Sequence, residues 1–92
     1  QLSQPEAQAE LESRLDSWLP KNRQIRYRKN LPGNQLYIQI QSASQVNPRY
    51  LEDIKSVLNT AFAAENTDLV LELYEQDGSL YYQDLFFELT SL

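Results

Sequence analysis

The sequence predicts an α+β fold with the element order α-β-β-α-β-β, in which a four-stranded antiparallel sheet has two helices packed on one face. Two segments, one ending near Leu19 and one spanning about 48–64, place apolar residues at helical spacing. Two others, 35–42 and 68–75, alternate apolar and polar residues as half-buried strands do. Each element has one apolar side, and all of these sides are buried when both helices cover the same face of the sheet.

The first helix is expected to begin at Ser3-Gln4-Pro5-Glu6, which matches a capping box in which the Ser3 hydroxyl accepts from a backbone amide and Glu6 reaches back. It is expected to end before Pro20, which cannot continue a helix. The second helix has its start signal at Asn47-Pro48, an N-cap residue followed by proline. The apolar residues that share one side of the first helix are Leu11, Leu15, Trp18 and Leu19.

The four strands are expected to form two hairpins. Residues 24–30 and 35–42 flank Leu31-Pro32-Gly33-Asn34, where proline and glycine supply the turn geometry. Residues 68–75 and 79–90 flank Asp77-Gly78, a strong two-residue hairpin signal. The last strand is long, and we expect a bulge near Gln83-Asp84.

Size and composition restrict the chemistry. With 92 residues and 10.7 kDa, residues 1–92 are expected to form one small α+β domain, and a start at Gln1 fits excision from a longer chain. The sequence has no Cys, His or Met, which excludes disulfides, thiol or imidazole metal ligands and histidine acid–base catalysis. Its acidic residues follow no calcium-loop pattern, and its two glycines cannot complete a phosphate-binding loop. We therefore expect no enzyme activity, no cofactor and no metal.

The charges are segregated along the chain, although the formal net charge of −5 argues against general affinity for nucleic acid or anionic membranes. From Glu52 onward nine acidic residues stand against Lys55 alone, a local net charge of −8. No apolar run is long enough to span a bilayer, so we expect no membrane association and a cytoplasmic location. Five of the eight basic residues lie in one segment that contains no acid: Lys21, Arg23, Arg26, Arg28 and Lys29.

The face of the sheet that points away from the helices is the expected contact surface. Because side chains alternate across a strand, the outward positions follow once the inward apolar residues are assigned. Several exposed aromatic residues on one face exceed what a monomer normally leaves in water, and such patches usually mark an interface. The expected outward residues are Arg26, Arg28, Tyr37, Gln39, Gln41, Val70, Glu72, Tyr74, Phe86 and Glu88.

Three hypotheses compete for this face. In the first, Tyr37, Tyr74 and Phe86 form the centre of a surface that binds another protein or a second copy of the chain, because Tyr and Arg are enriched at interface hot spots. In the second, single-stranded nucleic acid stacks on these aromatics while the five basic residues neutralise phosphates, although the acidic second half opposes this. In the third, nothing binds and the arginines pair with Glu72 and Glu88. We adopt the first, a non-catalytic protein-interaction or homodimerisation module.

The basic segment 21–29 has two interpretations of its own. Charges on an edge strand protect it from pairing with other strands, and the same charges are suited to contact a partner. The loop residues Lys21, Asn22 and Arg23 are favoured for partner contact. Arg26 and Arg28 are less favoured, because Glu72 and Glu88 are available to pair with them.

Overall fold

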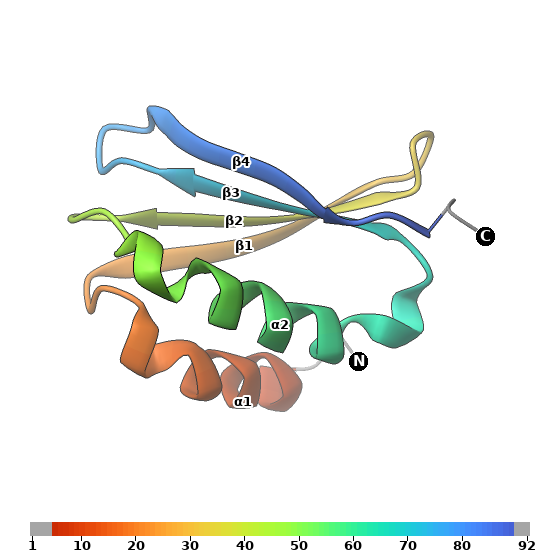
Figure 1. Cartoon of the computed structure of the whole chain (residues 1–92), viewed down its shortest axis with the longest axis horizontal. Helices are drawn as coiled ribbons and strands as arrows, with labels where there is room; N and C mark the ends of the chain where they lie inside the picture. Colours follow the sequence, from red (N-terminus) through yellow and green to blue (C-terminus); the bar gives the residue numbers. More distant parts are fainter. Residues whose placement is uncertain (1–4, 90–92) are drawn as a thin grey trace.

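The computed structural model describes residues 5–89 and has the predicted element order (Figure 1). Both helices lie on one face of a four-stranded sheet, and no helix of the described residues lies on the opposite face (Figure 1). The helices are α1 (Pro5–Leu15) and α2 (Leu51–Ala61), and the strands are β1 (Arg23–Asn30), β2 (Gln35–Ser42), β3 (Asp68–Tyr74) and β4 (Leu80–Phe87). Single 3₁₀ turns lie at Asp16–Trp18, Pro48–Tyr50 and Ala63–Glu65.

The sheet is mixed, so the prediction of a purely antiparallel sheet was wrong. The strand order is β1-β2-β3-β4, with both hairpins antiparallel and β2 parallel to β3. The cause is α2, which carries the chain back beneath the sheet, so that β3 starts at the same end as β2 (Figure 1). The two hairpins therefore meet through their inner strands, β2 and β3, at the centre of the sheet.

Both helices are shorter than predicted because their ends tighten into 3₁₀ turns. The helix α1 ends at Leu15 instead of Leu19, yet Leu19 remains buried in the core. The predicted cap of the second helix is confirmed, because the Asn47 side chain accepts a hydrogen bond of 3.1 Å from the Arg49 amide. The predicted cap at Ser3 lies outside the described residues.

The two hairpin turns use different left-handed residues. In the β1–β2 turn Asn34 has a φ of 52°, so this asparagine and not Gly33 takes the left-handed conformation. In the β3–β4 turn Gly78 has a φ of 93°, which fits the predicted Asp77-Gly78 signal. The Asp77 carboxylate also accepts a 2.9 Å hydrogen bond from the Ser79 amide, which fixes this turn.

The hydrophobic core lies between the sheet and the two helices. Alternate β2 residues point into it, as predicted, and helices α1 and α2 contribute Leu15 and Leu58. None of the helices in residues 5–89 has the length and apolar character needed to cross a membrane. The completely buried residues of the core include Leu15, Ile38, Ile40, Ile54, Leu58 and Leu71.

Strand β4 contains two irregularities, neither of them at the predicted position. Gln83 and Asp84 pair in regular register with Glu72 and Leu71. The register instead shifts at Tyr81 and again near Phe86, where one extra residue enters β4 each time. Each shift lets two consecutive aromatic residues reach the core side, a set formed by Tyr81, Tyr82, Phe86 and Phe87.

Candidate functional site

The open face, meaning the side of the sheet away from both helices, is organised in rows that run across the four strands. The registers place each residue beside its neighbours on the adjoining strands, and side chains in one row share a face. We name three rows: an apolar row of Arg28, Tyr37, Val70 and Leu85; a glutamate row of Arg26, Gln39, Glu72 and Gln83; and a third row of Gln24, Gln41, Tyr74 and Leu80.

The apolar row combines a fixed cation with exposed hydrocarbon. The Arg28 guanidinium lies over the Tyr37 ring, 4.5 Å from its centroid, which holds both side chains in place. Val70 is nearly covered by its neighbours, whereas Leu85 leaves 45% of its surface in water. Phe86 was expected on this face, but the register shift near Phe86 places Leu85 there instead.

Glu72 is a buried carboxylate in the middle of the open face, with 5% of its surface exposed. Its Oε1 accepts hydrogen bonds from Tyr74 Oη at 2.5 Å and Gln39 Nε2 at 2.9 Å, and its Oε2 accepts from Gln83 Nε2 at 2.7 Å. Burial raises the pKa of Glu72, but these three hydrogen bonds and the Arg28 charge outweigh it and leave the pKa below its usual value. The neighbours therefore hold a charge on this face without exposing it.

Tyr74 is tied to this carboxylate. Donating its proton to Glu72 raises the pKa of the Tyr74 hydroxyl, because the ionised phenol would lose that hydrogen bond and face a second negative charge. The same side chain lines a hollow of about 230 Å³ together with Arg26, Gln39, Gln41 and Gly78. Tyr74 thus lies on the open face as predicted, but its hydroxyl already donates a hydrogen bond to Glu72.

The five basic residues of segment 21–29 are divided between the two sides of the sheet. Arg26 and Arg28 lie exposed on the open face, and within residues 5–89 neither forms an ion pair shorter than 4.0 Å. The expectation that Glu72 pairs directly with these arginines was therefore wrong, because Glu72 is satisfied by Gln39, Tyr74 and Gln83.

The other three basic residues contact acids on the helix side. Arg23 places Nη2 2.9 Å from Asp16 Oδ1 and donates from Nη1 to the Pro20 carbonyl at 3.1 Å. The hydrogen bond from Arg23 to the Asp16 carboxylate, with the charge of Lys21 3.8 Å away, lowers the pKa of Asp16. Lys29 lies 3.4 Å from Glu65, beyond the end of α2. Arg23 therefore contacts Asp16 and the Pro20 carbonyl within the fold.

The prediction that Phe86 lies on the open face was also wrong, because this residue lies on the helix side of the sheet. It lines a hollow of about 380 Å³ between α2 and β4, where Lys55 contacts Asp84 at 2.7 Å. Burial lowers the pKa of Lys55, but hydrogen bonds to Asp84 and Tyr82 outweigh it and raise the pKa. Tyr82, under the Lys55 ammonium, also points to the helix side. Consecutive aromatic pairs in a strand are the sequence signal that could have revealed both bulges.

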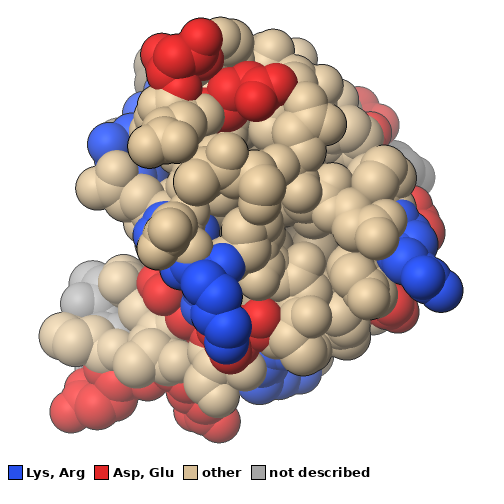
Figure 2. Space-filling model, turned by 90° about the vertical axis from the view of Figure 1, so that its left-hand side faces the viewer, with Lys and Arg blue, Asp and Glu red and all other residues tan. Residues whose placement is uncertain are grey.

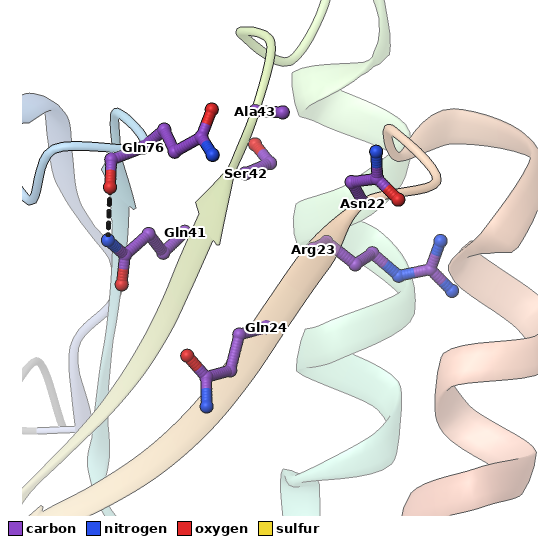
Figure 3. Close-up of a pocket in the computed structure, with 7 residues that line it drawn as sticks. All are labelled: Asn22, Arg23, Gln24, Gln41, Ser42, Ala43 and Gln76. Carbon is purple, nitrogen blue, oxygen red and sulfur yellow. Dashed lines mark hydrogen bonds between the residues drawn. The ribbon is translucent and has the colours of Figure 1, made fainter.

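A hollow of about 450 Å³ lies where β1 begins and β2 ends (Figure 3). Its walls are mostly neutral: Gln41 donates to the Gln76 carbonyl at 2.9 Å, and Arg23 points toward the helices (Figure 3). Among residues 5–89 no cluster of three or more acidic side chains is arranged to hold a metal ion. The residues that line the hollow are Asn22, Arg23, Gln24, Gln41, Ser42, Ala43 and Gln76.

The open face thus holds two of the three predicted central aromatics, Tyr37 and Tyr74, and two of the five basic residues, Arg26 and Arg28. Leu85 takes the place that the sequence had assigned to Phe86. Comparisons of the chain with models of known protein families, with curated proteins and with solved structures find no match.

Proposed function

We propose that this chain is a non-catalytic protein-interaction module of the cytoplasm, which binds another protein or a second copy of itself through the open face. The observation that carries the proposal is the apolar row, in which Tyr37, Val70 and Leu85 form a continuous strip across three strands. No helix within residues 5–89 covers this strip, in which Leu85 is 45% exposed whereas Val70 is 4% exposed between its neighbours. Apolar strips with a polar surround are typical of protein interfaces.

The geometry of Arg28 supports the same proposal. Its guanidinium is already held against the Tyr37 ring, so a partner that forms hydrogen bonds with Arg28 loses little side-chain entropy on binding. Arginine and tyrosine are the residue types that most often contribute binding energy at interfaces. The glutamate row beside them presents mostly uncharged amides, because Glu72 is enclosed by its hydrogen-bond donors.

Binding of single-stranded nucleic acid remains the second candidate, favoured by Arg26, Arg28 and Tyr37 on one face. The separation of the basic residues weakens it, since Lys21, Arg23 and Lys29 lie on the helix side beside Asp16 and Glu65. A phosphate chain on the open face would therefore meet two of the five positive charges. Phe86 is likewise unavailable for stacking there.

The proposal predicts site-specific cross-linking from the apolar row. A photoreactive phenylalanine analogue at position 85 is expected to give one discrete adduct in cells of the source organism, and Tyr37→Ser in the same chain is expected to weaken it at least severalfold. The same analogue at Leu31, a turn residue 76% exposed, is the matched control and is expected to give none. Adducts are measured by immunoblot and mass spectrometry.

The mass of the adduct distinguishes a second copy of the chain from a different partner protein. An adduct at twice 10.7 kDa indicates a second copy, and a different mass indicates another protein. Equal adducts from positions 85 and 31, or none from position 85, would contradict the proposal. Labelled oligo-dT is titrated in parallel at low salt; salt-sensitive binding that is lost in Arg26→Ala with Arg28→Ala would establish the nucleic-acid alternative instead.

A further inference from the structure

Strand β1 is an unpaired edge of regular geometry. Within residues 5–89 it pairs only with β2, over eight residues in unbroken register, and it contains neither proline nor a bulge. An edge of this kind presents backbone N–H and C=O groups along its outer side, which is a template for one more strand. The opposite edge, β4, is less suitable because two register shifts distort it.

The charges of β1 select what can pair with it. Arg26 and Arg28 project from the same side of the strand. Figure 2 shows acidic side chains at the top of the view, where the β3–β4 turn lies, and basic side chains on both flanks. Two β1 strands paired antiparallel with the centre at residues 26–28 would place arginine opposite arginine or close to it, which is unfavourable. An acidic strand would instead place carboxylates opposite both guanidinium groups, where bidentate hydrogen bonds form.

The other side of β1 favours apolar residues in the added strand. Ile25 and Tyr27 point toward the core but stay half-buried, because no strand covers the outer edge in residues 5–89. Apolar side chains beside them would complete their burial. The preferred sequence pattern therefore alternates an acidic residue, facing Arg26 or Arg28, with an aliphatic residue, facing Ile25 or Tyr27.

From this arrangement we infer that β1 accepts an acidic, extended segment of a partner protein as a fifth strand of the sheet, with its carboxylates beside Arg26 and Arg28. This inference rests on the proposed function in one respect, namely that the chain is a protein-interaction module. The partner segment would be acidic, and its contact with β1 would adjoin the apolar row, because Arg28 of β1 stacks on Tyr37 of that row.

The probe is a capped peptide of alternating Glu and Val, eight residues long to match β1. Titration to millimolar concentration, followed by NMR, is expected to shift the backbone amides of β1 and to slow the hydrogen exchange of those that point outward. Arg26→Gln with Arg28→Gln is expected to weaken binding at least tenfold. Arg14→Gln with Arg49→Gln, which changes the net charge equally but lies on the helices, is the matched control and is expected to bind normally. A Lys-Val peptide is expected not to bind.

Each alternative outcome overturns the inference. No binding of the Glu-Val peptide, unchanged binding by the Arg26/Arg28 variant, or protection confined to β4 or the open face would do so. Outward β1 amides that are already protected in the free protein, together with a doubled mass by light scattering, would assign the edge to a second copy. Cross-linking from position 85 is independent of these results, so the edge inference and the open-face proposal fail separately.

Discussion

Phe62→Ala is expected to lower the free energy of unfolding by about 3–5 kcal/mol, the range observed when a buried phenylalanine is truncated. Phe62 follows the last residue of α2, retains 2% of its surface exposed, and packs edge-on against Tyr27 of β1 with centroids 5.7 Å apart. Its removal leaves a cavity at the point where α2 meets β1. In a small domain with a total stability of about 5–15 kcal/mol, that loss is a large fraction of the whole.

Urea denaturation followed by circular dichroism measures this effect. Phe62→Leu, which refills part of the space, is expected to lose less than half as much. Leu31→Ala is the exposed control and is expected to change the stability by no more than about 0.5 kcal/mol. A loss below about 1 kcal/mol for Phe62→Ala would mean that this side chain does not join α2 to the sheet.

The second large effect is expected at Glu72. Glu72→Ala removes the acceptor of three hydrogen bonds and is expected to cost about 2–3 kcal/mol, since hydrogen bonds to a charged group are stronger than neutral ones. The loss should also free the Gln39 and Gln83 amides and the Tyr74 hydroxyl, and so loosen the glutamate row. Thermal and urea denaturation of the variant measure the change.

The pH dependence of stability tests the same carboxylate. Because the folded pKa of Glu72 lies below its usual value of 4.5, the ionised group stabilises the fold fully above that value, and this stability is lost as the pH falls through the folded pKa. Glu72→Gln is therefore expected to flatten the acid limb of the plot of unfolding free energy against pH. Glu10→Gln, which changes an exposed carboxylate on α1, serves as the control. An acid limb unchanged by Glu72→Gln would show that the three donors do not stabilise the charge.

Local patterns in the sequence predicted most of the elements. The alternation of Leu36, Ile38 and Ile40 gave β2 its observed bounds, and Asn47 marked the start of the second helix. These predictions succeeded because alternation and capping depend on residues close together in the chain. The parallel pairing of β2 with β3 depends on a contact across α2, and alternation reveals which face is buried but not which strand lies beside it. The sequence signal for this parallel pairing was the helix predicted between β2 and β3, because parallel neighbours in a sheet are usually connected by a helix.

The surface was harder to predict than the core. Tyr37 and Tyr74 were placed correctly, but the assignment of Phe86 assumed an unbroken alternation that β4 does not have. Glu72 looked like an ordinary exposed acid, since its burial depends on Gln39 and Gln83, which reach it from neighbouring strands. Side-chain partners that come from distant parts of the chain cannot be deduced from spacing along one strand.

The parallel contact between β2 and β3 also determines how the chain reaches its native state. Each hairpin closes through a short turn, but the central register joins residues that are 33 positions apart, such as Gln39 and Glu72. Closing that long loop costs more conformational entropy than forming either turn, and a two-stranded hairpin alone is only marginally stable. We therefore expect the meeting of the two hairpins at the middle of the sheet to be the slow step of folding, with the two halves acquiring their stability together.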